Sequence, residues 1–370
     1  MKVQFNNLFL QNNLVLNYSK KMFTEAIKYS KFIGGKEISV FEKNFAKKMK
    51  SKYCVSVANG TDALIISLKC LGIKSGDEVI TSAHSWVSTA GAIVAVGARP
   101  VFVDTDKYFT IDTKKIEAKI NKKTKAIIPV HLYGQSCAMD KLLIIAKKYK
   151  IKIIEDCAQA HLSKYKGKIL GNFGEVGTFS FFPGKNLGSI GDAGAIICNN
   201  KKIYNSLKLY KNHGSFKKNN HLTFGVNSRM DNIHASFLNK KLKFLDKFNS
   251  NRIKIAKKYQ SKLISNKYLE LPQSRKNSLH TFHQYVIKVK KNRKSLIDYL
   301  KNKNISTSIH YPKMIVNLKP YQKFANKKEF KNCSKDEKCI ISLPIHPFLT
   351  NKEIDFVCKI INDYFKTKIY

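Results

Sequence analysis

The chain has 370 residues, 43% of them hydrophobic, so it can bury the core of one large domain and a smaller one. Its 68 lysine and arginine residues against 25 acidic residues give a formal net charge of +43, but they are spread from end to end. This spread indicates a solvated basic surface that attracts an anionic substrate, and it argues against a nucleic-acid-binding protein. No apolar run is long enough to cross a membrane and no signal-peptide pattern is present, so we expect a cytoplasmic protein without a membrane partner. The eight cysteines are scattered without metal-ligand spacing, and we expect buried thiols and no metal site.

The first two thirds of the sequence predict an α/β fold. Residues 36–50 place apolar side chains at helical spacing and predict a helix with one buried face. From about Lys52 to Asn200, short β-branched runs alternate with amphipathic stretches, which predicts a mostly parallel central sheet with flanking helices. The expected strands are residues 53–58, 77–82, 99–104, 125–134, 151–156, 178–182 and 194–198, with helices at 61–72 and 140–150.

The sequence beyond Asp231 changes to long lysine-rich helices, expected at 232–248 and 251–263. We place a domain boundary near residue 245. Residues 1–245 would form the large α/β domain with an N-terminal helical segment, and residues 246–370 a smaller C-terminal α+β domain. In this second part we expect a strand at 283–289, a helix at 293–304, a strand-like segment at 306–312 and a final helix after the turn at 343–350.

The segment FSFFPGKNLGSIGDAGAI at 179–196 places Lys185 between an expected strand and a glycine-rich turn. No other basic residue occurs between Lys168 and Asn199, which is unusual in a chain so rich in lysine. A rigid, partly desolvated lysine has a lowered amine pKa, and its neutral amine can attack an aldehyde to form a Schiff base. By itself, the tripeptide PGK could also be a turn with an exposed lysine.

The segment IKIIEDCAQAH at 151–161 places Asp156 directly after a hydrophobic run. Residues at the carboxyl ends of parallel strands point into the ligand crevice of an open α/β sheet. A carboxylate there could pair with a protonated pyridine nitrogen, and Gln159 could bind a hydroxyl of the same ring. The alternative is that Asp156 caps the N-terminus of a helix.

The segment ANGTDALIISL at 58–68 opens an expected helix with Gly60 and Thr61. Free backbone N–H groups and the helix dipole make such a turn an anion site, and Thr61 adds a hydroxyl. A capped helix that follows a strand would explain the pattern equally well.

Together and in this order, these segments resemble the sugar aminotransferases of the DegT/DnrJ/EryC1/StrS family, which have fold type I of the pyridoxal-phosphate enzymes. The resemblance runs through most of the chain. It takes in FEKNFA near residue 41, NGTDAL at 59, TSAHSWVSTA at 81, PVFVD at 100, TKAIIPVHLYGQ at 124, IIEDCAQAH at 153, FSFFPGKNLGSIGDAGA at 179, FGVNSRMDNIHA at 224, IHYP at 309 and SLPIHPFLT at 342.

The resemblance implies a cofactor and the residues that hold it. Lys185 would bind pyridoxal 5′-phosphate as a Schiff base and shuttle protons, and Asp156 would pair with the pyridine nitrogen. Trp86, the only tryptophan, would stack on the pyridine face. The other implied contacts are Gly60, Thr61 and Ser180 for the phosphate, Gln159 for the ring hydroxyl, and Asn227, which would reach the phosphate from the second subunit of a homodimer with shared active sites.

The resemblance also implies substrate contacts for His310, Tyr311 and His283, although His283 could equally be a structural histidine. Three positions depart from the family's usual pattern. His234 stands where glutamine is common, Leu162 where the pattern usually continues His-Gly, and Val226 where an aromatic residue commonly precedes Asn227. None of them has a cofactor role, so they bear on substrate details and not on the class of reaction.

The implied reaction is transfer of an amino group, with glutamate as donor, to a keto sugar attached to a nucleoside diphosphate. The segments around Lys185 and at 309–312 look like the branch that acts on 3-keto 6-deoxy sugars, whose products enter surface polysaccharides or glycoconjugates. A 4-keto sugar aminotransferase and a regulatory protein that binds the cofactor without turnover are the alternatives. A sugar dehydratase of the same family is disfavoured, because those enzymes replace the lysine with histidine.

Overall fold

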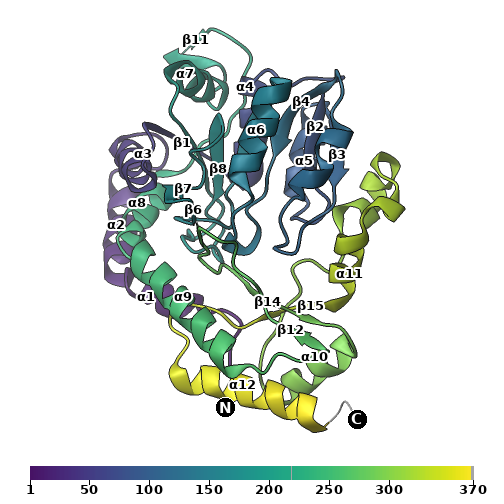
Figure 1. The fold of residues 1–370 in the computed structure, drawn as a ribbon. Coiled ribbons are helices and arrows are strands. Elements are labelled where there is room, and N and C mark those ends of the chain that lie inside the picture. The colour runs from purple at the N-terminus through teal and green to yellow at the C-terminus, as the bar shows by residue number, and fades with distance from the viewer. Residues whose placement is uncertain (218, 368–370) are drawn as a thin grey trace.

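A computed structural model describes residues 1–217 and 219–367, and its centre is a seven-stranded sheet (Figure 1). The strands follow the order β1-β9-β8-β5-β4-β2-β3, and the neighbours from β8 to β3 pair in parallel. Only β9 is reversed among these seven, since it pairs antiparallel with both β8 and β1. Their bounds are β1 Tyr53–Val57, β2 Glu78–Ser82, β3 Arg99–Val103, β4 Thr124–Ile128, β5 Lys152–Asp156, β8 Val176–Ser180 and β9 Gly194–Cys198. The predicted mostly parallel sheet is therefore confirmed.

Helices cover both faces of this sheet because successive strand residues point to opposite sides. On one face, Ile80 and Ile153 pack with α3 (Lys36–Met49), α6 (Met139–Tyr149) and α8 (Asn232–Leu242). On the other face, Val79 and Ile154 pack with α4 (Gly60–Cys70), α5 (Ser88–Ala95) and α7 (Lys201–Tyr210). The sheet is thus buried on both sides, as expected for parallel strands.

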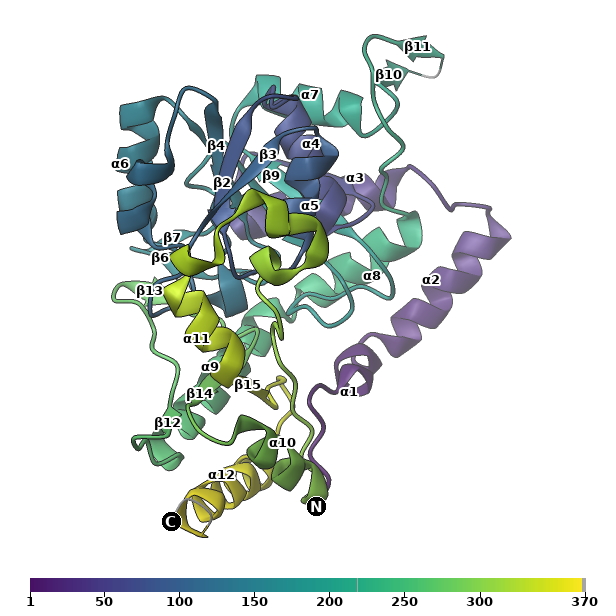
Figure 2. The ribbon, with the colours of Figure 1, turned by 90° about the vertical axis from the view of Figure 1, so that its right-hand side faces the viewer.

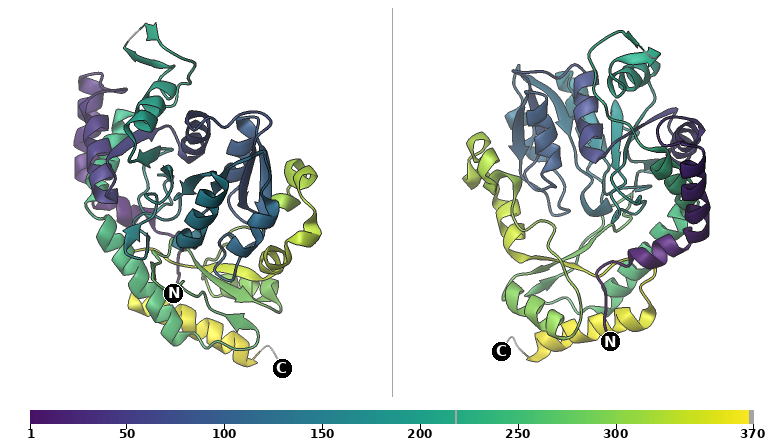
Figure 3. Two further views of the ribbon diagram at one scale, coloured as in Figure 1. Left: turned by 45° about the horizontal axis from the view of Figure 1, so that its top comes forward. Right: turned by 180° about the vertical axis from the view of Figure 1, so that it is seen from behind.

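Two smaller β elements are attached to this layer structure. Strands β6 (Lys164–Tyr165), β7 (Lys168–Ile169) and β13 (Ser278–Leu279) form a short antiparallel sheet. Strands β10 (Ser215–Lys217) and β11 (Asn220–His221) form a hairpin that projects away from the rest of the fold (Figures 2 and 3).

The C-terminal part has a hydrophobic core of its own, with Tyr259, Ile287, Leu296 and Val357 among its buried members. It is built from α9 (Leu245–Lys262), β12 (Leu269–Glu270), β14 (Tyr285–Val289), α10 (Arg293–Asn302), α11 (Lys331–Cys339), β15 (Ile340–Leu343) and α12 (Asn351–Thr367). Strands β12, β14 and β15 form an antiparallel sheet. The exact domain boundary near residue 245 stays a prediction.

Three expected segments differ from the structure. The helix expected at 232–248 is interrupted, because α8 ends at Leu242 and α9 begins at Leu245. The strand expected at 125–134 ends at Ile128, since Pro129 has no N–H to continue the ladder. The strand-like segment at 306–312 makes a single bridge, between Ser308 and Ser342, and then leaves the sheet.

The N-terminal segment begins against the C-terminal part and ends beside the large sheet domain. It carries α1 (Leu8–Asn13) and α2 (Leu16–Lys28), and α2 packs on α8. Figure 2 shows this segment running from the neighbourhood of α10 to α1 and α2. Among the described residues, no helix is both long and apolar enough to cross a membrane.

Candidate active site

A cleft of about 720 Å³ opens at the carboxyl ends of the parallel strands, where open α/β sheets bind their ligands. Asp156 ends β5 and Ser180 ends β8, while Trp86 follows β2, so the sheet itself brings these side chains together. Every site residue predicted from the sequence lines this cleft except Asn227. The lining members are Gly60, Thr61, Trp86, Asp156, Gln159, Ser180, Lys185, His283, His310 and Tyr311.

Lys185 lies in a tight turn between β8 and β9, where its backbone N–H donates to the carbonyl of Phe182 over 2.9 Å. The turn requires glycine at position 188, because a Cβ there would lie 2.0 Å from the carbonyl oxygen of Pro183. Burial lowers the pKa of the Lys185 amine to about 8, although the carboxylate of Asp156 acts in the opposite direction. About a tenth of this lysine is therefore neutral at pH 7, in the form that a nucleophilic amine must take.

The loop that carries Lys185 is fastened to other elements. The side chain of Asn186 donates to Asn249 on α9 over 2.8 Å and lies 3.1 Å from the imidazole Nδ1 of His283. The buried ammonium of Lys241 on α8 donates to the carbonyl of Gly188 over 2.9 Å. These contacts hold the loop in one conformation and so fix the direction of the Lys185 side chain.

Asp156 is buried, with only 5% of its surface exposed, and both of its carboxylate oxygens are hydrogen-bonded. The hydroxyl of Thr89 donates to one oxygen over 2.9 Å and the N–H of Ala158 to the other over 3.1 Å. Burial raises the pKa of this carboxyl group, and a protonated ring nitrogen at the site would offset that desolvation. The helix-cap interpretation is wrong, since residues 157–163 form no helix.

The N-terminus of α4 lies at the cleft. Its cap is Asn59, whose side chain accepts from the N–H of Asp62, while Gly60 and Thr61, whose N–H groups have no partner within the helix, line the cleft. Gly60 lies so close to Ser180 that a Cβ on it would be 2.7 Å from the Ser180 Cβ. These N–H groups, the helix dipole and the Ser180 hydroxyl suit a phosphate group.

Thr61 and Asp62, in the first turn of α4, each form a side-chain hydrogen bond with a serine. The hydroxyl of Thr61 donates to Ser88 over 2.9 Å, so a second hydroxyl lies beside it. The carboxylate of Asp62 accepts a 2.7 Å hydrogen bond from Ser228, which engages the one acidic group in the first turn of α4.

Trp86 and Gln159 both contact Tyr311 in the cleft. The Trp86 ring is 56% exposed, and its centroid lies 5.3 Å from that of Tyr311. The Gln159 amide oxygen accepts from the N–H of Tyr133 over 2.7 Å, and its nitrogen donates to the Tyr311 hydroxyl over 2.8 Å. Because an amide nitrogen carries two hydrogens, one remains for a ring hydroxyl in the cleft.

His283 and His310 line the cleft as neutral imidazoles. Burial lowers the pKa of His310 to about 4 and that of His283 well below its usual value, and the Lys185 charge acts in the same direction. The Nδ1 atom of His310 lies 2.8 Å from the hydroxyl of Ser342. His283 already has Asn186 as its partner, so a structural role and a substrate contact are both compatible with its position.

Asn227 is exposed and lies outside the cleft of the described chain, where it forms a bridge with Asn212. Its expected role belongs to a second subunit and stays a prediction. Of the departures from the family pattern, His234 lies beside the lysine loop, since a Cβ at Gly191 would be 3.1 Å from its Nε2.

Several cleft residues were missed by the sequence reasoning. Thr89, which binds Asp156, lies in a helix of small residues that gives no sign of a polar role. Phe5 and Asn6 come from the far N-terminus, and nothing in their local sequence points to a site. Asp192 and Gln284 also line the cleft without a recognisable motif.

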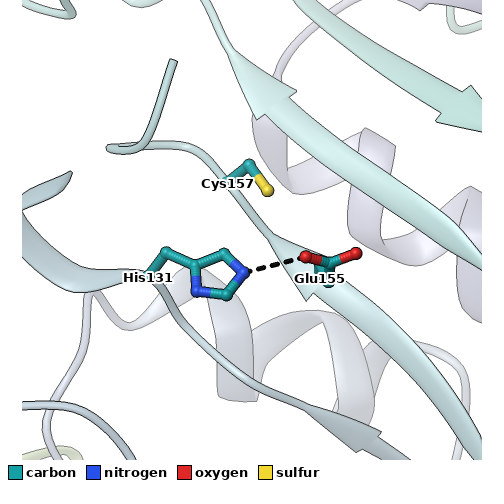
Figure 4. Close-up of side chains that lie close together, drawn as sticks. All are labelled: His131, Glu155 and Cys157. Carbon is teal, nitrogen blue, oxygen red and sulfur yellow. Dashed lines mark hydrogen bonds and ion pairs between the residues drawn. The ribbon is translucent and has the colours of Figure 1, made fainter. Parts of the chain in front are cut away.

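Outside the cleft, His131, Glu155 and Cys157 form a buried cluster with metal-ligand side chains (Figure 4). The carboxylate of Glu155 accepts from the N–H groups of Gly171, Phe173 and Gly174 at 2.6–2.9 Å, and it lies 3.1 Å from the Nε2 atom of His131. The Nδ1 atom of His131 accepts from the N–H of Cys137, so Nε2 carries the proton and donates to Glu155. Both ring nitrogens of His131 and both carboxylate oxygens of Glu155 are thus engaged in hydrogen bonds, which join β5 to residues 171–174.

A lysine of lowered pKa, a buried carboxylate and a helix N-terminus in one cleft are the features expected of the class of α/β enzymes that use pyridoxal phosphate. Comparison with solved structures agrees. S. venezuelae DesV in complex with a ketimine intermediate has a TM-score of 0.94 and 32% identity, covering 98% of both chains. NtdA from Bacillus subtilis with bound cofactor PMP has a TM-score of 0.92 and 31% identity, covering 99% of this chain and 86% of that chain.

Comparison of sequences identifies the family. A dTDP-3-amino-3,6-dideoxy-alpha-D-galactopyranose transaminase from Aneurinibacillus thermoaerophilus is 42% identical over 334 residues, or 90% of this chain and 91% of that protein. The DegT/DnrJ/EryC1/StrS aminotransferase family matches residues 16–362. The chain belongs to this family and is a pyridoxal-phosphate-dependent nucleotide-sugar aminotransferase.

Proposed function

We propose that this cytoplasmic enzyme moves an amino group from glutamate to the 3-keto group of a 6-deoxy sugar carried on a nucleoside diphosphate. The product would be an amino sugar for surface polysaccharide or glycoconjugate synthesis. The observation that carries the proposal is the pair formed by Lys185 and Asp156, which face one cleft and influence each other's pKa.

The chemistry of the reaction divides between the cofactor and the chain. Pyridoxal phosphate, when bound, supplies an aldehyde that condenses with amines and a pyridine ring that delocalises negative charge. Lys185 holds the cofactor and, once released, its neutral amine moves a proton at the substrate carbon. Asp156 holds the proton of the ring nitrogen, and Thr89 and Ala158 keep its carboxylate in place.

The remaining contacts orient the two ends of the cofactor. Gly60, Thr61 and Ser180 are proposed to bind its phosphate, because they bring N–H groups and hydroxyls to the N-terminus of α4. Trp86 is proposed to cover the ring face and Gln159 to donate its free N–H to the ring hydroxyl. Tyr311, His310 and His283 then face the sugar side of the cleft.

The choice of a 3-keto sugar rests on two sequence segments and one relative. The FFPGKNLGSIGDAGA segment and the IHYP segment at 309–312 look like those of 3-aminotransferases. The relative from Aneurinibacillus thermoaerophilus carries a 3-amino sugar in its name. A shift of the ketone by one ring carbon moves it by roughly 1.5–2.5 Å, which is enough to lose a near-attack geometry.

A homodimer with shared active sites is proposed from the exposure of the segment around Asn227. Phe224 is 95% exposed and Leu222 61%, and Phe182, beside the cleft, is 56% exposed. Large apolar side chains with this degree of exposure favour a surface that another protein covers. A second copy of the chain would bury them and bring Asn227 to the partner's cofactor phosphate.

The decisive experiment incubates the purified enzyme with glutamate and a panel of keto sugar nucleotides, with product mass as the readout. We expect the 3-keto 6-deoxy sugar to be aminated much faster than its 4-keto isomer. Faster turnover of the 4-keto isomer would make the enzyme a 4-aminotransferase. Binding of the cofactor without conversion by any amine donor would favour the regulatory alternative.

A further inference from the structure

The N-terminal strap, residues 3–12, passes along the cleft and is fastened at both ends. At the start, Val3 is fully buried and exchanges backbone hydrogen bonds with Asn304 and Ser306 at 2.9 and 3.0 Å. At the end, the side chain of Asn12 accepts a 2.8 Å hydrogen bond from the buried ammonium of Lys241. Lys241 also holds the loop of Lys185, so the strap and this loop share an anchor.

Between these two anchors, Phe5 and Asn6 line the cleft. The ring of Phe5 stacks on that of His310, with centroids 5.7 Å apart and planes 21° from parallel. Asn6 lies against the lysine loop, since a Cβ at Gly184 would be 3.9 Å from its Nδ2 atom. The strap therefore forms a wall of the cleft beside the reacting lysine.

The orientation of the Asn6 amide follows from its neighbour Gln11. The nitrogen of Gln11 is placed as the donor of that buried side chain by the carbonyl of Asn7 at 3.4 Å, while its Oε1 atom has no partner in the described chain. The same nitrogen donates to the Oδ1 atom of Asn6 over 3.0 Å. This leaves the Nδ2 atom of Asn6 on the side of Gly184, and within the described chain no acceptor for it is found.

We propose that Asn6 is a specificity-determining residue whose Nδ2 donates a hydrogen bond to a hydroxyl of the sugar ring bound beside Lys185. This inference rests on the proposed function. A neutral amide donor matches a neutral hydroxyl, whereas the carboxylates of glutamate are bound best by cationic groups. The stacked ring of Phe5 shields this contact from water on the strap side.

The test compares Asn6→Ala and Asn6→Asp with Asn7→Ala as the matched control. Asn7 is the next residue of the strap, but its side chain caps α1 by accepting from Leu10 and does not line the cleft. The two half-reactions of the holoenzyme are followed separately by absorbance, one with glutamate and one with the keto sugar.

For Asn6→Ala we expect kcat/KM with the keto sugar to fall roughly 3- to 10-fold, which is the effect of one neutral hydrogen bond. Asn6→Asp should lose more, because a carboxylate replaces the donor and still accepts from Gln11. The glutamate half-reaction should stay within about twofold of wild type in both variants, and Asn7→Ala should leave both half-reactions at that level. Wild-type enzyme should also be assayed with a set of sugar analogues that each lack one hydroxyl. For one of these analogues, kcat/KM should fall by the same factor as it does for Asn6→Ala with the complete sugar.

Unchanged sugar kinetics in both Asn6 variants would overturn the inference, and so would an equal loss in both half-reactions or in Asn7→Ala. These results differ from a failure of the proposed function, in which wild-type enzyme would not react with glutamate at all.

Discussion

The amide nitrogen of Gln159 donates a hydrogen bond of 2.8 Å to the hydroxyl of Tyr311, which joins the end of the central sheet to a segment of the C-terminal part. The same amide accepts from Tyr133, so it is held from two sides. Burial raises the pKa of the Tyr311 phenol well above its usual value, and the group stays protonated at physiological pH. The proposed cofactor contact of Gln159 and the proposed substrate contact of Tyr311 are therefore linked through one hydroxyl.

Removal of that hydroxyl should loosen the cofactor site. In Tyr311→Phe, Gln159 loses one partner, and we expect the dissociation constant of pyridoxal phosphate to rise roughly 3- to 10-fold. Titration of the apoprotein measures it. Tyr321→Phe serves as control, because Tyr321 is a buried tyrosine of a separate cluster near α11. Equal cofactor affinity in wild type and Tyr311→Phe would contradict the link.

Lys185→Ala should abolish the visible absorption of the covalently bound cofactor. It should also lower the transaminase rate by a factor on the order of 10³ or more, as the loss of a catalytic group does in other enzymes. Asp156→Asn should retain part of the cofactor but lose most turnover, because a neutral amide cannot hold the ring nitrogen protonated. Absorbance spectra and steady-state rates check both variants. Wild-type turnover by Lys185→Ala would disprove the assignment of the nucleophile.

The covalent capture of the cofactor should depend on pH in a way set by Lys185. Since the pKa of its amine is lowered to about 8, the neutral form increases about tenfold per unit below pH 8 and levels off above it. Asp156 raises this pKa, so Asp156→Asn should move the midpoint to lower pH. The rate of absorbance change on mixing apoprotein with the cofactor gives the profile.

Lys241 provides an internal control for this measurement. Burial lowers its pKa to about 8 as well, but its side chain is fully buried and bound to Gly188 and Asn12. Borohydride reduction followed by peptide mass analysis should find the cofactor on Lys185 and not on Lys241. Attachment at Lys241 would show that accessibility from the cleft does not decide which lysine reacts with the cofactor.

The buried hydrogen bonds of His131 and Glu155 should stabilise the fold without a metal. Glu155→Gln places an amide where three N–H groups point, and we expect the free energy of unfolding to fall by about 1–3 kcal/mol. Thermal unfolding with and without a chelator measures both points. A chelator-dependent loss of stability, with one metal ion per chain by elemental analysis, would contradict this interpretation.

Shared active sites predict complementation between two inactive variants. In heterodimers of Lys185→Ala with Asn227→Ala, one of the two sites would contain both native residues, so activity should return to roughly half the wild-type level, as the symmetry of a two-fold dimer requires. Mixed chains with different affinity tags allow heterodimers to be isolated and assayed. Verified heterodimers without any gain in activity would place Asn227 outside the partner's site.

Local sequence was enough for the parts of the fold in which local chemistry and structure agree. The β-branched runs around Ile80, Ile127 and Ile154 predict strands covered on both faces, as the structure has them, and the isolation of Lys185 in a basic chain singled out a residue that lines the cleft. The resemblance to a family supplied Trp86 and Ser180, whose local patterns are unremarkable.

Long-range pairing could not be predicted in the same way. Residues 306–312 read as a strand, but after Ser308 the backbone turns to the cleft, where the N–H of Tyr311 donates to His84. The position of the strap could not be predicted either, because Val3 forms a β-bridge with Ile305, which is far away in the sequence. Two-residue strands such as β6 and β13 carry too little pattern to be recognised.

The reversed direction of β9 has a consequence for how the lysine is presented. A parallel successor to β8 would require a connection that crosses to the far edge of the sheet. Because β9 runs back alongside β8, residues 181–193 stay at the carboxyl edge from first to last. The Lys185 loop therefore begins and ends at two paired strand residues, because Ser180 at the end of β8 lies opposite Gly194 at the start of β9. Changes in residues 181–193 would therefore alter the lining of the cleft without changing the paired strands β8 and β9 that hold the loop.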